Sequence, residues 1–150
     1  MSEKSPFAKF HHIGILVKDM DKAIAYFESL GLGPFEPLVL SGDELEQSAY
    51  GKPTKRKLKN MCTHVGVVEL EVIQPLEDAV LQENFMKTRG EGINHIGFKV
   101  EDVDSARAEL EKKGLKVIQT RSNTSGMKSI YVDSDKVGGV QIEIWQPPAK

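Results

Sequence analysis

The chain has 150 residues, of which 39% are hydrophobic and 28% are charged, and its formal net charge at pH 7 is −2. This balance gives no electrostatic reason to expect nucleic acid or an anionic membrane surface as a partner. No apolar run approaches the length of a membrane span. The single cysteine, Cys62, cannot form an internal disulfide, and the first residues lack an apolar leader, so we expect a cytoplasmic protein.

The first predicted elements are a strand over residues 10–17 and a helix over residues 20–30. Asp19 stands where an N-cap is expected, and Gly31 provides the helix stop. Three further strands are predicted at about 35–40, 56–65 and 68–74. A tight turn at Gly66-Val67 should join the last two of them into a hairpin.

The same order of elements follows in the second half of the chain. Residues 77–92 are predicted to be a linker that carries a short helix over Ala79–Lys87. A strand over 93–100 and a helix over 103–113 come next. Three further strands are predicted at about 115–121, 128–133 and 140–146. Each half of the chain therefore has the order βαβββ.

The second half also repeats the sequence of the first. Residues 10–32 (FHHIGILVKDMDKAIAYFESLGL) reappear at 93–115 (INHIGFKVEDVDSARAELEKKGL), an offset of 83 residues. Matching strands close the copies, Glu71-Val-Ile-Gln-Pro in the first and Glu143-Ile-Trp-Gln-Pro in the second. We therefore predict one domain over residues 1–150, built from modules at about 10–76 and 93–148. The modules should share one core, because neither is long enough to bury sufficient apolar surface alone.

Side-chain alternation along the strands places one histidine and one glutamate of each module on a polar face. His12 and His95 lie opposite apolar residues of their strands, and the same holds for Glu71 and Glu143. Glu69 shares the face of Glu71. A lone strand histidine usually bonds a backbone group, but both residue types recur at equivalent positions. Two imidazoles and two carboxylates are suitable ligands for one divalent Co, Ni, Zn, Mn or Fe ion.

The modules differ in length at one place. His12 and Glu71 are 59 residues apart, whereas His95 and Glu143 are 48 apart. We assign the 11 extra residues to the polar stretch 41–57, which we expect to be a loop that serves as a substrate lid. Five basic residues cluster beside it: Lys52, Lys55, Arg56, Lys57 and Lys59. They could hold the phosphates of a CoA ester or the carboxylates of glutathione, or they could simply form a solvated charged loop.

The repeated His-Ile-Gly strand, the Asp-x-Asp that opens each helix and the Glu-x-x-Gln-Pro ending resemble the vicinal-oxygen-chelate superfamily. That superfamily includes glyoxalase I, methylmalonyl-CoA epimerase, extradiol dioxygenases and bleomycin-resistance proteins. The resemblance covers about residues 10–148. It implies an α+β fold, in which two βαβββ modules form a U-shaped mixed sheet, or half-barrel, around a cleft with the helices outside. It also implies a homodimer, and one divalent ion held by His12, Glu71, His95 and Glu143 and chelated by two neighbouring substrate oxygens.

Within the superfamily, the chain is most similar to methylmalonyl-CoA epimerase-type members. That resemblance implies removal and return of the proton α to a thioester, which requires two bases on opposite faces of the carbon. Glu143 is the candidate for one of them. Bacterial epimerases supply the other from a strand of the first module, but residues 54–65 contain no acid. His64 is our candidate there, because its pKa suits proton transfer near neutrality. Its alternative role is a hydrogen-bond partner that lines the cavity.

Three other functions could use these residues. A glyoxalase I-like lactoylglutathione lyase, acting on a glutathione hemithioacetal, would need the same four ligands. An extradiol dioxygenase is disfavoured, because its triad of two histidines and one carboxylate leaves Glu71 without a role. A non-catalytic protein that binds a drug or small molecule, as bleomycin-resistance proteins do, is disfavoured by the complete ligand set.

Overall fold

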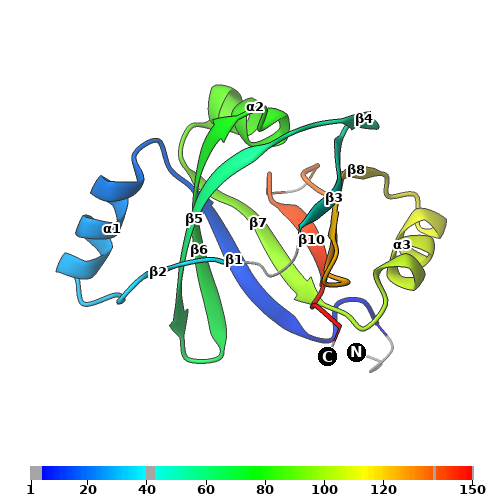
Figure 1. Cartoon of the computed structure of the whole chain (residues 1–150), viewed down its shortest axis with the longest axis horizontal. Helices are drawn as coiled ribbons and strands as arrows, with labels where there is room; N and C mark the ends of the chain where they lie inside the picture. The colour runs from blue at the N-terminus through cyan, green and yellow to red at the C-terminus, as the bar shows by residue number, and fades with distance from the viewer. Residues whose placement is uncertain (1–4, 40–42, 137, 150) are drawn as a thin grey trace.

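The structure, a computed structural model, describes residues 5–39, 43–136 and 138–149. These residues form a ten-stranded mixed sheet that curls into a half-barrel, with three helices on its outer side (Figure 1). The predicted α+β class and the U-shaped sheet are confirmed. Within the described part of the chain, no helix combines the length and the apolar character needed to cross a bilayer.

The elements follow the predicted order, with two additional short strands. The first module contains β1 (Phe10–Leu16), α1 (Met20–Ser29), β2 (Glu36–Pro37), β3 (Glu44–Ala49), β4 (Lys52–Pro53), β5 (Lys57–Val65) and β6 (Val68–Glu77). The linker carries α2 (Val80–Arg89). The second module contains β7 (Gly92–Lys99), α3 (Val103–Lys112), β8 (Val117–Asn123), β9 (Lys128–Val132) and β10 (Gln141–Gln146).

The two modules meet at their first strands. β1 pairs antiparallel with β7, and each of these strands also pairs in parallel with the last strand of its own module, β6 or β10. The full sheet order is β2-β5-β6-β1-β7-β10-β9-β8-β3-β4. The run β1-β6-β5-β2 in one module therefore corresponds to β7-β10-β9-β8 in the other. This arrangement places both histidine strands side by side in the middle of the sheet.

The expectation of a loop over residues 41–57 is wrong for most of that stretch. β3 pairs antiparallel with β8 of the other module, and β4 then pairs with β3 as the outermost strand. Residues 40–42 lie outside the described part of the chain. The predicted strand at 35–40 is only the two-residue β2. The polar sequence of β3 suits a sheet edge, but its partner residues lie at least 70 positions away, so local pattern could not reveal the pairing.

The glutamine that ends each module holds the start of that module's helix. The backbone N–H of Met20 donates to Gln74 Oε1 at 2.9 Å, and that of Val103 donates to Gln146 Oε1 at 3.0 Å. The first N–H groups of a helix have no partner within it, so each glutamine satisfies one of them. The repeated Gln-Pro ending therefore fixes each helix against the last strand of its module.

Two apolar clusters attach helices to the outer face of the sheet. One packs Val103, Ala106 and Leu110 of α3 against buried residues of β9 and β10. The other packs Met20 of α1 against Val72 of β6 and their neighbours. The described residues thus have one buried cluster for each module, whereas we predicted a single shared core. Because the apolar side chains face the helices, the inner face of the sheet is left for polar groups.

Candidate metal centre

Two rows of residues cross the inner face of the sheet, one residue from each of four neighbouring strands. One row consists of Glu69, His12, Gly97 and Glu143. The other consists of Glu71, Gly14, His95 and Gln141. Each histidine therefore lies beside a glycine of the other module. The repeat in the sequence becomes a near-symmetric arrangement around the β1–β7 pair.

The two glycines provide the space that the imidazoles occupy. A Cβ atom on Gly14 would overlap the ring of His95, and a Cβ atom on Gly97 would overlap the ring of His12. Neither glycine has a positive φ angle. Glycine therefore stands two positions after each histidine because a side chain there would overlap an imidazole, and not because the backbone needs a special conformation.

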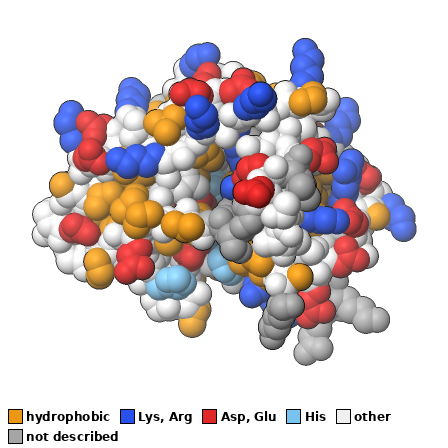
Figure 2. Space-filling model, viewed as in Figure 1, with side chains coloured by type: hydrophobic (Ala, Val, Ile, Leu, Met, Phe, Trp, Pro, Cys, Tyr) orange, Lys and Arg blue, Asp and Glu red, His pale blue; other side chains and the backbone are white. Residues whose placement is uncertain are grey.

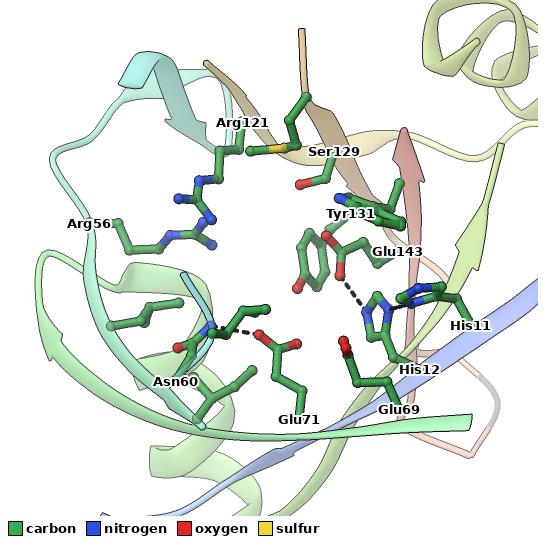
Figure 3. Close-up of a pocket in the computed structure, with 15 residues that line it drawn as sticks. His11, His12, Arg56, Asn60, Glu69, Glu71, Arg121, Ser129, Tyr131 and Glu143 are labelled. Atoms are coloured by element: carbon green, nitrogen blue, oxygen red, sulfur yellow. Dashed lines mark hydrogen bonds and ion pairs between the residues drawn. The ribbon is translucent and has the colours of Figure 1, made fainter. Parts of the chain in front are cut away.

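The structure brings the four predicted metal ligands together, and all four are buried. His12 Nε2 lies 2.9 Å from Glu143 Oε2 (Figure 3). It also lies 3.1 Å from His95 Nε2. His95 Nε2 lies 3.3 Å from Glu143 Oε2 and 3.5 Å from Glu71 Oε2. One ligand atom from each of the four residues lies within 4.8 Å of the others. Two ligands that bind one ion at right angles, each at about 2.1 Å, stand about 3 Å apart, so the donor set fits a divalent ion.

Neighbouring polar groups orient these side chains. Asn94 Oδ1 lies 3.2 Å from His95 Nδ1, and since this oxygen can only accept, the Nδ1 atom carries a proton and leaves Nε2 for the centre. Asn60 Nδ2 donates to Glu71 Oε1 at 2.6 Å (Figure 3). The Nδ1 atoms of His11 and His12 are 3.0 Å apart. Both histidines of the centre therefore direct Nε2 towards it.

The charges of the centre are strongly coupled. Burial disfavours the charged form of His95, but hydrogen bonds to Glu143 and Glu71 outweigh it and raise the His95 pKa to about 9. Burial likewise opposes the charge on Glu143, and hydrogen bonds from His12 and His95 still hold its pKa well below the usual value. Without a metal ion, a proton on His95 thus supplies positive charge between two carboxylates.

We expect the metal-free protein to lose stability as the pH rises above about 6.5. The His95 pKa is about 9 in the folded protein against an ordinary value of 6.5, so its contribution is complete below pH 6.5 and is lost as the pH rises through 9. The difference corresponds to about 3 kcal/mol. Because the Glu143 pKa is lowered, its contribution is lost only under acid conditions. Urea unfolding in EDTA at pH 6 and pH 9.5 measures the effect, and equal unfolding free energies would contradict it.

The centre opens into a cavity of about 150 Å³. On the face shown in Figure 2, basic and histidine side chains are visible in a narrow hollow between the two halves of the molecule. Apolar side chains such as Leu58, Ile73 and Met127 form part of its wall. Trp145 also lines the cavity, and the centroid of its ring lies 4.6 Å from that of His11. His95 lies beneath the wall and is fully buried.

The structure does not place His64 among the residues that line this cavity. The predicted turn is present, since Val65 pairs with Val68 and Gly66 has a φ of +64°. The His64 side chain, however, is 66% exposed, and its Nε2 lies 3.8 Å from Glu69 Oε2. His64 shares the face of its β6 partner Glu69, but it lies one residue before the end of β5, beside an exposed turn, so the expectation that it lines the cavity is wrong.

Glu69 is a second acid of the first module that lines the cavity, beside Glu71, and the sequence analysis gave it no role. Its side chain is 15% exposed, and burial, followed by the nearby charge of Glu71, raises its pKa. The sequence did contain evidence for Glu69 as a cavity residue, because alternation along the strand puts it on the face of Glu71. Glu69 lies on β6, the strand after the stretch 54–65 in which we expected the second base.

Comparison with known proteins gives consistent matches over nearly the whole chain. A family model described as Glyoxalase/Bleomycin resistance protein/Dioxygenase superfamily matches residues 11–132. The mitochondrial methylmalonyl-CoA epimerase of Homo sapiens is 22% identical over 142 residues, which cover 92% of this chain and 73% of the relative.

Solved structures agree on the fold. Methylmalonyl-CoA epimerase from Mycobacterium tuberculosis matches with a TM-score of 0.70 and 21% identity, covering 99% of this chain and 94% of that chain. A variant of Streptomyces coelicolor methylmalonyl-CoA epimerase, in complex with 2-nitronate-propionyl-CoA, matches with a TM-score of 0.68 and 21% identity. That match covers 95% of this chain and 99% of the other. At such identities the structural likeness establishes the fold alone.

Proposed function

Because this chain belongs to the glyoxalase/bleomycin resistance protein/dioxygenase superfamily, we propose that it is a divalent-metal-dependent enzyme that moves a proton next to a carbonyl group. The first candidate reaction is the epimerisation of an acyl-CoA thioester of the methylmalonyl-CoA type. The main support is the buried set of two histidines and two glutamates beside a cavity that a further carboxylate, Glu69, also lines. The relatives named as methylmalonyl-CoA epimerases support the choice of substrate.

In this proposal His12, Glu71, His95 and Glu143 hold one Co, Ni, Zn, Mn or Fe ion, and the donor types do not select among these metals. When bound, such an ion polarises the substrate carbonyl and stabilises the negative charge that develops as the α proton leaves. The Asn60 amide holds the Glu71 carboxylate in position through its hydrogen bond.

The proposed base is Glu143, whose carboxylate lines the cavity. Inversion of a stereocentre needs a second group on the opposite face of the carbon. We propose Glu69 for this role in place of His64. Glu69 projects from β6 of the first module, whereas Glu143 projects from β10 of the second, and β1 and β7 lie between these strands. The two carboxylates therefore reach the cavity from different sides of the histidine pair. The homodimer and the cytoplasmic location stay predictions.

The metal-loaded protein should incorporate one deuterium at the α carbon of methylmalonyl-CoA in D₂O and should convert one epimer into the other. Mass spectrometry measures the first result and separation of the epimers measures the second. Protein treated with EDTA should do neither. No exchange by protein that carries one metal ion per chain would exclude the epimerase. Formation of a thioester from the hemithioacetal of methylglyoxal and glutathione would instead identify the glyoxalase I-like lyase.

A further inference from the structure

Two arginines lie on the cavity wall across from the metal centre. Arg56 immediately precedes β5, and Arg121 lies on β8 of the other module. Both line the cavity. Figure 3 shows their guanidinium groups side by side, with His12 and Glu143 on the opposite side of the open space. This pair of like charges has no role in the proton transfer described above.

In the part of the chain that the structure describes, only one of the two arginines forms an ion pair. Arg121 forms an ion pair with Glu44, and its Nε lies 2.7 Å from Glu44 Oε1. Arg56 Nε donates to the neutral Gln47 Oε1 at 3.2 Å. Within the described part of the chain, Arg56 forms no ion pair with a carboxylate. Glu44 therefore pairs with Arg121 alone, and the carboxylates of Glu143 and Glu71 act on Arg56 without an ion pair.

Strand β3 holds both arginines in this arrangement. Glu44 and Gln47 both belong to β3, and each accepts a hydrogen bond from the Nε atom of one arginine. The Gln47 amide also donates to the backbone carbonyl of Arg56 at 3.4 Å. With its Nε atom engaged by Gln47, Arg56 keeps its two terminal amino groups for the cavity. The length difference between the modules thus has a structural consequence, since the extra residues position two cations at the site.

The arginines also lie where the cavity meets a second, outer pocket. Arg56, Arg121, Leu58 and Asn60 line both spaces, and Glu44 lines the outer one. A substrate that extends from the metal centre towards the outside would therefore pass the two guanidinium groups.

A partly buried guanidinium without an anionic partner is costly, and it gains most from an anion that enters the cavity. Burial, and then the charge of Arg121, lower the pKa of Arg56, although opposing contributions from Tyr131 and Glu143 raise it. A guanidinium nevertheless stays charged at neutral pH. Its planar fork of N–H donors matches the two oxygens of a carboxylate or a phosphate.

We propose that Arg56 and Arg121 bind an oxyanion of the substrate, a carboxylate or a phosphate, that is separate from the oxygens at the metal centre. This inference rests on the proposed function, because it assigns the anion to the molecule that reacts there. It restricts the substrates to carbonyl compounds that carry an anionic group in addition to the oxygens at the metal centre. The anion belongs either to the acyl part or to the phosphates of a CoA ester.

The fluorescence of Trp145 can report binding without turnover, because it is the single tryptophan and lines the same cavity. Full-length protein with its metal is titrated with malonate and, separately, with inorganic phosphate at constant ionic strength. We expect saturable binding that weakens at least tenfold in Arg56→Gln and in Arg121→Gln. Arg107→Gln, at an exposed arginine of α3 paired with Glu111, is the control and should bind like the parent.

The pattern of affinities identifies the source of the anion. Tighter binding of malonate assigns the subsite to a carboxylate of the acyl part, and tighter binding of phosphate assigns it to the nucleotide. Equal binding by the parent and both arginine variants, or no saturable binding of either anion, overturns the inference.

The melting temperature provides a second measurement of anion binding. Malonate or phosphate should raise that of the parent but not that of Arg56→Gln, and an equal rise in both would contradict the subsite. Saturable anion binding without deuterium exchange would reject the epimerase and keep the subsite.

Discussion

Glu143→Gln should slow deuterium exchange by about a thousandfold for the methylmalonyl-CoA epimer whose α proton faces Glu143, within the range that general base catalysis contributes. The amide has nearly the shape of the carboxylate and still offers an oxygen to a metal ion, but it cannot accept the α proton. The rate of exchange and the metal content, measured on the same preparation, separate these two properties. A variant with full metal content and the parent's exchange rate with both epimers would exclude Glu143 as a base.

Glu71→Gln is the matched control, because Glu71 occupies the equivalent place in the first module. Its amide oxygen can still accept the hydrogen bond from Asn60, and the proposed mechanism gives it no proton to carry. We expect it to retain far more exchange activity than Glu143→Gln at equal metal content. Equal losses in both variants would assign Glu143 the role of a ligand alone.

Glu69→Gln tests the second base through a different result. If Glu143 removes the proton from one epimer and Glu69 returns it on the other face, the variant should still exchange deuterium into one epimer. It should no longer invert that epimer. Loss of exchange with both epimers would place Glu69 in the structure of the site rather than in proton delivery.

Most of what we predicted correctly about the sheet and its histidines follows from the internal repeat. Alternation along strands correctly put His12 and His95 on the face opposite the helices, because a strand's two faces follow directly from sequence. The hairpin at Gly66 set the register that pairs Cys62 with Glu71. Once the copies are recognised, the parallel and antiparallel pairings of one module repeat in the other.

The missed strand β3 and the missed role of Arg121 share a physical cause, which is that both depend on contacts distant in sequence. β3 is a strand because β8 offers it an edge, and nothing near residue 44 encodes that partner. The role of Arg121 depends on the same pairing, since Glu44 and Gln47 arrive beside it from the other module. The prediction that His64 lines the cavity was wrong for another reason. Alternation gives a side chain's face but not the point along a strand at which that face becomes exposed to solvent.

His95→Ala should remove stoichiometric metal and should lower the free energy of unfolding by about 3–5 kcal/mol, the cost of breaking a buried ion pair. The imidazole is 0% exposed and lies between Glu71 and Glu143, so its loss leaves two buried carboxylates without their shared partner. His12→Ala should also lose the metal. Elemental analysis and urea unfolding measure the two effects, and full metal occupancy in both variants would contradict the centre.

The matched control is His64→Ala, which removes an imidazole that is 66% exposed. It should keep its metal and change stability by no more than about 0.5 kcal/mol.

The pH dependence of stability distinguishes unpaired charge from lost packing in His95→Ala. In metal-free His95→Ala, the pKa of Glu143 should rise, because hydrogen bonds from His95 help to hold it down. Acid that protonates the carboxylate should then recover part of the lost stability. A deficit that stayed constant from pH 7 to pH 4.5 would indicate lost packing rather than unpaired charge.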